Sequence, residues 1–246
     1  MRKRVKRSPE WSERFDEKPF GLRGDQTGED EADFIRRALG LRKGHAVLDA
    51  PCGAGRVAVH LARRGILITG IDLTESHIRR ARRRFRKEKL PGTFLLRDMR
   101  EIDFTSEFDG VFNWQGSFGY FSDAQNLDVL RRFARALKPG GRVLIDQPNR
   151  EHLLRHFRGR TARGGVTITV RWNQATQRVE STHRFLRDGR RRSAAMFIRL
   201  YTPAQFRRLF ARAGLTVEAL YGNLFGDEYN RGSRRLHIVG RLEKPG

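Results

Sequence analysis

The sequence predicts an α/β fold with a doubly wound parallel sheet. Five short apolar runs alternate with segments of helical periodicity between residues 29 and 145, and turn residues separate them. The chain of 246 residues is 38% hydrophobic, which is enough for one domain of the larger kind with a full core. In a sheet of this kind the carboxyl ends of the strands meet at one edge, where ligands bind.

The elements of the predicted core follow one another in a regular order. The first helix runs through Phe34 and Leu39 and ends at Gly40, because glycine readily ends a helix. The predicted strands are 46–48, 66–68, 93–96, 110–112 and 142–145. The first ends in Asp49, the second ends near Asp72 and the third ends before Asp98. The helices between them are 54–64, a basic helix capped by Thr74, and 123–138. Residues 29–159 are therefore expected to form the ligand-binding core, and the polar residues 1–28 to form a flexible arm or lid.

The hydrophobic pattern changes from helical to alternating beyond the fifth strand. Alternating apolar residues occur in three segments, 166–172, 179–185 and 196–200. Such alternation is typical of antiparallel strands, and Asp188-Gly189 suits a tight turn between the second and third of them. Residues 160–201 are therefore predicted to form a small antiparallel β insert after strand five.

Residues 202–246 are predicted to complete the core. Thr202 and Gln205 have the spacing of a capping box, and Pro203 occupies the first helical position. Two further strands, 215–221 and 235–241, follow this helix.

Composition argues against a membrane protein, a secreted protein and a structural zinc protein. No window approaches the ~18 uninterrupted apolar residues of a membrane span, and the basic residues 1–7 run into Ser-Pro-Glu and not into an apolar segment. Cys52 is the single cysteine and the seven histidines are scattered, so no disulfide and no metal-ligand cluster is expected. We therefore expect a cytoplasmic protein without a metal site.

A net charge of +23, from 51 Lys and Arg against 28 Asp and Glu, suggests a polyanion such as RNA as a partner. Only eight of the basic residues are Lys, and an excess of Arg spread over the chain is equally typical of a codon bias. The densest basic run, 79–89, lies on a predicted helix whose apolar residues Ile78, Ala81 and Phe85 form one face, so its charges are expected on the solvent face. Nucleic acid is therefore an alternative partner and not the favoured one.

Residues 49–56, Asp-Ala-Pro-Cys-Gly-Ala-Gly-Arg, join the first strand to a helix, the arrangement that binds nucleotide-like ligands at a helix N-terminus. Glycines suit such a loop because a Cβ would keep the ligand away from the backbone, and Gly53, Gly55 and Ala58 even match a dinucleotide fingerprint. Asp49 argues against a dinucleotide, because its carboxylate would repel a pyrophosphate about 4 Å away by about 1 kcal/mol in water and about 4 kcal/mol near a protein surface. A cationic ligand fits this loop better.

Two more carboxylates follow the next two strands. Asp72, at the end of the second strand, is placed to accept hydrogen bonds from both hydroxyls of a ribose. Asp98, after the third strand, could accept one from an exocyclic adenine amine, with Met99 against the ring. Each Asp taken alone could be a turn or N-cap residue, but three at successive strand ends after a glycine-rich loop indicate a ligand with an adenosine, a sulfonium and an ammonium. S-adenosylmethionine is that ligand.

These segments resemble the motifs of the class I S-adenosylmethionine-dependent methyltransferases, and the resemblance covers about residues 30–241. Residues 47–56 are similar to the first motif, with Pro51 where the common form has Gly, residues 70–73 resemble the ribose motif, and residues 97–100 resemble the adenine motif. The resemblance implies a Rossmann-like sheet of seven strands with the last one antiparallel. It also implies S-adenosylmethionine as the cofactor, bound by the following residues: Asp49, Cys52, Gly53, Gly55, Asp72, Leu73, Asp98, Met99 and Trp114.

A bacterial small-molecule subgroup of this family is more similar still. The resembling segments are 112–121, 146–150, 199–203 and 221–222. The resemblance implies that the insert and the N-terminal arm cover an acceptor pocket, with these pocket residues: Gln115, Tyr120, Asn149 and Arg150. The segment after strand four lacks the Asn/Asp-Pro-Pro-aromatic motif of enzymes that methylate exocyclic base amines, and no Cys besides Cys52 is present to attack a pyrimidine.

The mechanism we expect is direct in-line transfer of the methyl group to a nitrogen or oxygen of a small molecule. A sulfonium methyl is already activated, so the protein mainly has to align the acceptor and exclude water. An amine needs only to arrive in its neutral form, whereas a hydroxyl needs a base, for which Tyr120, His152 and His183 are candidates. Each of the three could instead be a packing or surface residue, so no base is assigned. The alternatives are an RNA methyltransferase of the same fold and a non-catalytic domain that binds S-adenosylmethionine.

Overall fold

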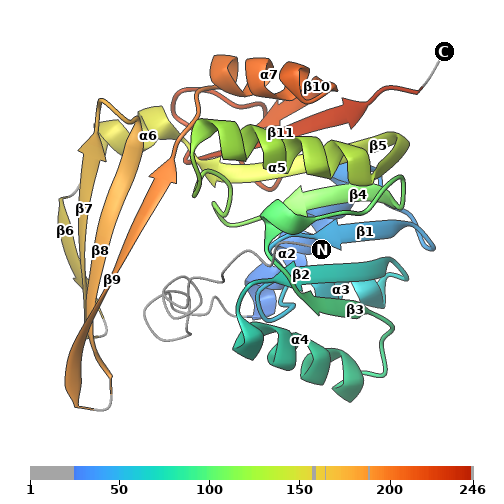
Figure 1. Cartoon of the computed structure of the whole chain (residues 1–246), viewed down its shortest axis with the longest axis horizontal. Coiled ribbons are helices and arrows are strands. Elements are labelled where there is room, and N and C mark those ends of the chain that lie inside the picture. The colour runs from blue at the N-terminus through green and yellow to red at the C-terminus, as the bar shows by residue number, and fades with distance from the viewer. Residues whose placement is uncertain (1–24, 157–158, 164, 188, 245–246) are drawn as a thin grey trace, which may run out of the picture.

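The computed structural model describes residues 25–156, 159–163, 165–187 and 189–244 (Figure 1). Its main sheet has seven strands in the order β10-β11-β5-β4-β1-β2-β3, and β11 runs antiparallel to both of its neighbours. The strands are β1 (Ala46–Asp49), β2 (Leu67–Asp72), β3 (Thr93–Leu96), β4 (Phe108–Asn113), β5 (Leu137–Pro148), β10 (Leu215–Tyr221) and β11 (Arg235–Leu242). The predicted doubly wound sheet is thus confirmed, while the predicted arm lies outside the described residues up to residue 24.

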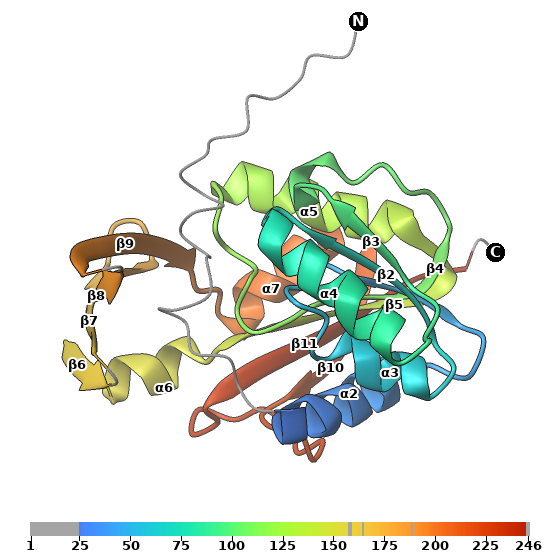
Figure 2. The ribbon, with the colours of Figure 1, turned by 90° about the horizontal axis from the view of Figure 1, so that it is seen from below.

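Helices cover both faces of this sheet (Figure 2). One face carries α2 (Asp25–Leu39), α3 (Ala58–Arg63) and α4 (Glu75–Lys87), and the other carries α5 (Asp123–Ala136) and α7 (Pro203–Arg212). Successive strand residues supply the two buried clusters: Val47 packs with the first set of helices and Leu48 with the second. Because both faces are buried, the strands are nearly continuous apolar runs, and their polar residues are concentrated at the ends.

The helix ends follow the local sequence signals. Ser122 and Gln125 form a capping box at α5, and Thr202 and Gln205 form the one predicted at α7. Thr74 occupies the N-cap position of α4 as predicted, but its side chain makes no capping hydrogen bond. These local interactions determine the residues at which α5 and α7 begin.

The predicted starts of α3 and β5 differ from the structure by several residues. Helix α3 begins at Ala58 and not at residue 54, because residues 54–57 remain in the loop that follows β1. Strand β5 begins at Leu137, directly after α5, and not at residue 142, because the predicted Pro-Gly-Gly turn is absorbed as an irregularity in the pairing of β5 with β4. The strand tolerates this irregularity because it is paired on both sides, with β4 and with β11.

After β5, helix α6 (Arg150–Arg155) leads into a separate four-stranded antiparallel sheet, which we call the insert (Figure 1). Its strands are β6 (Arg160–Arg163), β7 (Val166–Asn173), β8 (Arg178–Arg187) and β9 (Arg190–Arg199), in that order. The β insert after strand five is therefore confirmed, with one strand more than the alternation predicts. The sequence of β6, Arg-Thr-Ala-Arg, has no apolar alternation to signal a strand. The predicted turn residue Asp188 lies outside the described residues.

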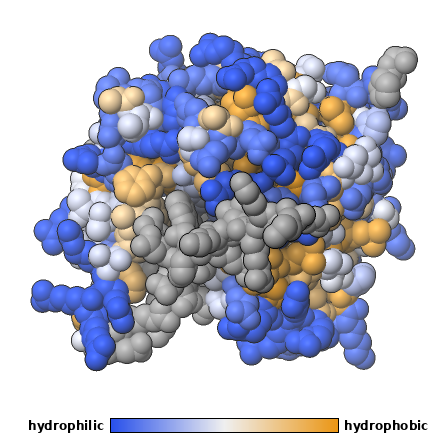
Figure 3. All heavy atoms as spheres, viewed as in Figure 1, coloured by the Kyte–Doolittle hydropathy of each residue, from blue (hydrophilic) through white to orange (hydrophobic). Residues whose placement is uncertain are grey.

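On the face seen in Figure 3, hydrophilic residues are spread over the outer parts, with hydrophobic areas between them. On α4 the apolar residues Ile78, Ala81 and Phe85 are buried and Arg79 and Arg83 are exposed, as predicted. Within the described part of the chain, no helix combines the length and the apolar character needed to cross a membrane.

Candidate functional site

The loop after β1 leaves open space beside its backbone, and we call it the cradle. Gly53 has a φ of +53°, and nothing lies within 4 Å of the position that a Cβ would occupy there. Its N–H donates to Oδ2 of Asp72 (2.9 Å), which ties the loop to the end of β2. Gly55 serves packing instead, because its φ is +71° and a Cβ would lie 3.3 Å from Cβ of Ala81 on α4. The open space beside Gly53 therefore suits a ligand that approaches the backbone closely.

Three carboxylates lie at the same edge of the sheet, as predicted from the strand ends. Asp49, Asp72 and Asp98 are only 3%, 7% and 8% exposed. Burial and the charge of Asp72 raise the pKa of Asp49 well above its ordinary value, against the opposing effect of Arg56. Asp98 accepts the N–H of Arg100 (2.8 Å) and also pairs with its guanidinium. A cation beside Asp49 would lower the cost of its buried charge, which is the electrostatic basis for a cationic ligand.

The carboxylates face one cavity of about 2050 Å³, to which both the sheet edge and the insert contribute. The predicted site residues that line it are Asp49, Cys52, Gly53, Asp72, Leu73, Asp98, Met99, Trp114, Gln115, Tyr120 and His152. The insert contributes Val170, Met196 and Ile198. Four other candidates, Gly55, Asn149, Arg150 and His183, are not among the described residues that line the cavity.

Cys52 is a buried free thiol at the cavity wall. Burial, followed by the charges of Asp49 and Asp72, raises its pKa well above the ordinary value. The thiol is therefore protonated at neutral pH and is not a nucleophile. Its Sγ–H donates to the carbonyl oxygen of Gly53 (3.4 Å).

Tyr120 lines the cavity in the segment after β4. Burial raises its pKa to about 12, with a smaller contribution from the charge of Asp72, although a hydrogen bond with Ser117 opposes the shift. The phenol is therefore protonated at neutral pH. It is suited to donating a hydrogen bond to a bound molecule, and less suited to acting as a base.

The two candidate histidines occupy different surroundings. His152, on α6, lines the cavity, with Nδ1 3.1 Å from the carbonyl oxygen of Gly232 and its ring stacked on His156. His183, on β8, is 7% exposed, its Nε2 lies 3.2 Å from Oγ of Ser181, and burial lowers its pKa. His183 thus lies on the same face of β8 as Ser181, but it is not among the described residues that line the cavity.

Asn149 and Arg150 hold neighbouring segments together. Asn149 caps α6, its Nδ2 donates to the carbonyl of Ser233 (2.7 Å), and its Oδ1 accepts from the Tyr229 hydroxyl (2.8 Å). The guanidinium of Arg150 lies 5.2 Å from the ring centre of Trp172 in the insert. Both side chains thus support the walls of the cavity without lining it.

Arg56 belongs to the glycine-rich loop, but its charge has a partner. It forms an ion pair with Glu31 of α2, which is 3% exposed. Nε2 of Gln115 lies 3.5 Å from both carboxylate oxygens of Glu31. These contacts tie α2, the loop after β1 and the segment after β4 together beside the cavity.

Among the polar lining residues that the sequence prediction misses, three form a group: Asp146, Arg235 and His237. Asp146 lies near the end of β5 and forms an ion pair with Arg235 of β11, and Nδ1 of His237 lies 3.1 Å from its Oδ1. Arg235 and His237 are two residues apart in a strand, so the sequence could have indicated a shared face. Their partner on β5 follows only from the pairing of β11 with β5.

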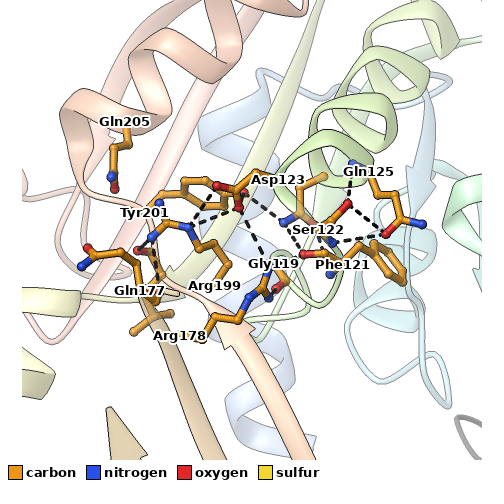
Figure 4. Close-up of polar contacts among 12 residues, drawn as sticks. Gly119, Phe121, Ser122, Asp123, Gln125, Gln177, Arg178, Arg199, Tyr201 and Gln205 are labelled. Carbon is orange, nitrogen blue, oxygen red and sulfur yellow. Dashed lines mark hydrogen bonds and ion pairs between the residues drawn. The ribbon is translucent and has the colours of Figure 1, made fainter. Parts of the chain in front are cut away.

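The insert is joined to the core by backbone contacts to the segment after β4 (Figure 4). The N–H of Arg199 donates to the carbonyl of Gly119 (2.8 Å). Arg178 donates to the same carbonyl (3.0 Å) and to the carbonyl of Phe121 (2.6 Å). Gly119 has a φ of +102°, and a Cβ there would lie 2.4 Å from the carbonyl oxygen of Arg199. Glycine is therefore required where β9 crosses this segment.

Side chains strengthen the same junction around Asp123, the first residue of α5. Its Oδ1 accepts from Nε of Arg199 (3.2 Å) and from the Tyr201 hydroxyl (3.2 Å), as Figure 4 shows. Arg199 is 7% exposed, and its guanidinium lies 4.9 Å from the centre of the Tyr201 ring. The end of the insert is thus anchored next to the segment that carries Tyr120.

Comparisons with known proteins agree with this geometry. Residues 47–141 match a family model described as a methyltransferase domain. Over 119 residues the chain is 35% identical to the S-adenosyl-L-methionine-dependent Diels-Alderase iccD of Talaromyces variabilis, an alignment that covers 46% of this chain and 39% of that protein. This chain thus spans less than half the length of that relative.

Two solved structures show the same fold over almost the whole chain. The CcbJ methyltransferase of Streptomyces caelestis has a TM-score of 0.76 at 20% identity, over 90% of this chain and 99% of its own. CalS10 of Micromonospora echinaspora, an amino pentose methyltransferase solved with S-adenosylmethionine bound, has a TM-score of 0.65 at 21% identity, over 91% of this chain and 93% of its own.

The seven-stranded sheet with its antiparallel last strand, the glycine cradle and the carboxylates at three strand ends define an S-adenosylmethionine-binding fold. Residues 47–141 match the methyltransferase domain, and the chain has the fold of S-adenosylmethionine-dependent methyltransferases. Two of its structural neighbours, CalS10 and KedS8, are named an amino pentose methyltransferase and a sugar N-methyltransferase. The open space beside Gly53 and the buried carboxylates of Asp49 and Asp72 fit the cofactor of this family.

Proposed function

We propose that this protein transfers the methyl group of S-adenosylmethionine to a small-molecule acceptor bound between the carboxyl edge of the sheet and the insert. The observation that carries the proposal is that one cavity has two kinds of wall. One wall has the carboxylates of Asp49, Asp72 and Asp98, and the other has the apolar residues Val170, Met196 and Ile198. A cofactor with an adenosine and two cationic groups suits the first wall, and an uncharged part of an acceptor suits the second.

The residues of the first wall bind and orient the cofactor in this proposal. Asp72 accepts from the ribose hydroxyls, Asp98 and Met99 receive the adenine, and Asp49 faces the cationic end. Leu73 and Trp114 pack against the cofactor, and its methyl group, once bound, is the activated one-carbon unit. The protein then has to align the acceptor and exclude water.

The residues of the second wall come from the insert, which we propose covers the acceptor. Val170, Ser181 and Met196 pair directly across β7, β8 and β9, so their side chains share one face of the insert. Val170 and Met196 line the cavity, which identifies this face as the inner one. In this division of the chain, residues 29–159 bind the cofactor, the insert covers the acceptor, and residues 202–246 complete the core.

The names of the structural neighbours support a small acceptor. CalS10 is named an amino pentose methyltransferase and KedS8 a sugar N-methyltransferase. The cavity of about 2050 Å³ has room for both a cofactor and a molecule of that size. Gln115 and Tyr120 lie at the cavity wall in the segment after β4 and are the polar groups that we propose contact the acceptor.

The first experiment tests the cofactor. A ligand that binds only the native state at 100 times its Kd stabilises that state by about 2.7 kcal/mol, so S-adenosylmethionine and S-adenosylhomocysteine should raise the Tm, and NAD should not. The absence of a shift with either sulfur compound would remove the basis of the proposal.

The second experiment tests the insert. Replacing residues 160–198 with a Gly-Ser linker retains Arg199 and the buried Tyr201. We expect this variant to keep the Tm shift with S-adenosylhomocysteine and to lose transfer of label from methyl-labelled S-adenosylmethionine to the small-molecule fraction of a cell extract. Loss of cofactor binding as well would instead make the insert part of the core.

A further inference from the structure

Asp146 and His237 lie side by side at the cavity on the paired strands β5 and β11. They are directly opposite in the antiparallel register, so their side chains share one face of the sheet. Nδ1 of His237 lies 3.1 Å from Oδ1 of Asp146, and the two residues are each 2% exposed. On the other side of the carboxylate, Nε of Arg235 donates to Oδ1 (2.8 Å) and its Nη2 donates to Oδ2.

Asp146 is a carboxylate throughout the neutral range. Burial raises its pKa, but the charge of Arg235 and the hydrogen bond and charge of His237 outweigh burial and hold it at about 2. A carboxylate beside Nδ1 favours the imidazole form with the proton on that nitrogen. Nε2 is then the nitrogen with a free lone pair.

The ring of His237 is held in place by aromatic neighbours. It stacks on Trp114 with ring centres 5.1 Å apart and an interplanar angle of 13°, and the ring of Phe34 lies 4.9 Å away. Nε2 of His237 and Nε1 of Trp114 have no hydrogen-bond partner among the described residues, and Nδ1 of His237 has only the ion-pair contact with Asp146; both side chains line the cavity. Buried polar atoms without partners in a cavity wall are atoms that a bound molecule can satisfy.

We propose that His237 is the catalytic base of the methyl transfer and that the acceptor atom is a hydroxyl oxygen. This inference rests on the proposed function and adds the acceptor class to it. A hydroxyl has one hydrogen and two lone pairs. Its hydrogen suits Nε2 of His237, one lone pair accepts from Nε1 of Trp114, and the other attacks the methyl group. A neutral amine has a single lone pair, so its attack would leave the Trp114 donor unpaired.

The proposed step conserves atoms and charge. A bond forms between the acceptor oxygen and the methyl carbon while the carbon–sulfur bond breaks, and the electron pair of that bond stays on sulfur. The hydroxyl proton moves to Nε2 of His237, and the carboxylate of Asp146 stabilises the imidazolium that results. Asp146 is a positioning residue in this scheme, and Arg235 fixes the direction of its carboxylate.

The product and a pair of variants test the proposal. With carbon-13-methyl S-adenosylmethionine and the small-molecule fraction of a bacterial extract, we expect the labelled methyl carbon to have the chemical shift of an O-methyl group. His237→Gln should lower turnover by about 100-fold or more, the usual range for loss of a general base, and leave the Kd for S-adenosylhomocysteine within about threefold. The matched control is His45→Gln, at the opposite edge of the sheet, which should leave turnover unchanged.

An N-methyl product, or a fall of less than about tenfold in His237→Gln, would overturn the assignment of His237 while the proposed function stands. Transfer of no label, despite cofactor binding, would instead contradict the proposed function.

A measurement on the wild-type protein tests His237 without any acceptor. Nitrogen-15 NMR of the histidine side chains, with His237→Gln to assign the signal, should show the neutral ring protonated at Nδ1 and free at Nε2. Diethyl pyrocarbonate should acylate Nε2 of His237, and peptide mapping by mass spectrometry would locate the product. A ring protonated at Nε2, or one that stays unmodified while the other cavity histidines react, would overturn the proposal.

Discussion

Asp72 shows how a single carboxylate can serve the fold and the site together. Its Oδ2 accepts the N–H of Gly53 (2.9 Å) and its Oδ1 accepts the N–H of Thr74 (2.8 Å), so it organises both the cradle and the start of α4. The residue also lines the cavity. Its removal should therefore affect the ligand and the loop at once.

We expect Asp72→Ala to weaken binding of S-adenosylhomocysteine by about 5-fold to 150-fold, because the lost acceptor leaves polar groups unpaired at about 1–3 kcal/mol. The Tm of the free protein should also fall, since the N–H of Thr74 loses its acceptor. Isothermal titration calorimetry and thermal unfolding measure the two effects. Asp128→Ala, on the exposed face of α5, is the control, and an unchanged Kd in Asp72→Ala would remove Asp72 from the site.

The lowered pKa of Asp146 leads us to expect a specific dependence of the free energy of unfolding on pH. Its pKa is lowered to about 2 in the folded protein, from an ordinary value of 3.8. A carboxyl with a lowered pKa stabilises the fold above its unfolded pKa and loses that contribution as the pH falls through its folded pKa. The contribution is about 2 kcal/mol, fully present above about pH 5 and lost progressively toward pH 2.

Acid unfolding of the wild type and of Asp146→Asn tests this effect. The free energy of unfolding of the wild type should exceed that of the variant at pH 6, and the difference should shrink between pH 5 and pH 2 by about 2 kcal/mol. A constant difference over this range would contradict the low pKa of Asp146.

At the scale of elements, the junction between the insert and the core depends on close approach of two backbones. A Cβ on Gly119 would lie 2.4 Å from the carbonyl oxygen of Arg199, which belongs to the last residue of β9. Two arginine side chains and one backbone N–H reinforce this contact. The orientation of the insert should therefore be sensitive to one methyl group at this position.

Gly226 provides a matched control for Gly119. Both have a positive φ, +97° at Gly226 and +102° at Gly119, but nothing lies within 4 Å of a Cβ on Gly226. Gly226→Ala should cost only the backbone strain, about 1–3 kcal/mol, and Gly119→Ala should cost about 1–3 kcal/mol more. Denaturant unfolding measures both, and hydrogen exchange should show faster exchange in β8 and β9 of Gly119→Ala only. Equal losses in the two variants would mean that the junction can shift freely.

At the scale of the whole molecule, the question is whether the charge of +23 serves a polyanion. Arg79, Arg83 and Arg86 of α4 are exposed, whereas the cavity is lined by other residues of this helix and its neighbours. Such a charged surface will bind RNA at low salt whatever its function. Binding through about 6–10 phosphate contacts weakens by about 10³–10⁵ between about 50 and 200 mM salt. Transfer of label is therefore a more decisive test than binding.

We expect the combined variant Arg79→Glu, Arg83→Glu and Arg86→Glu to transfer label to small molecules at a rate within about tenfold of the wild type, a change of less than about 1.4 kcal/mol in the barrier. The measurement uses radiolabelled S-adenosylmethionine at near-physiological salt, with RNA and small molecules separated afterwards. Efficient labelling of RNA by the wild type that collapses in the variant would make α4 a substrate platform and favour the RNA alternative.

The sequence by itself determined the order of the elements and three carboxylates that line the cavity. Apolar runs and capping residues act over a few neighbours in the chain, so the strand ends at Asp49, Asp72 and Asp98 could be located from local pattern. Parallel strands bring their carboxyl ends to one edge, which is why three local predictions converged on one cavity.

The tertiary structure decided which polar residues face each other across strands and which side of the insert lies inward. His237 meets Asp146 only because β11 pairs with β5 in one particular register, and a shift of one residue would turn the side chain to the other face. The same holds for Asn149, whose residue type suits a site but whose side chain instead donates to the carbonyl of Ser233, 84 residues further along the chain, and so supports the wall. Such contacts depend on long-range pairing and packing, and local periodicity carries no information about either.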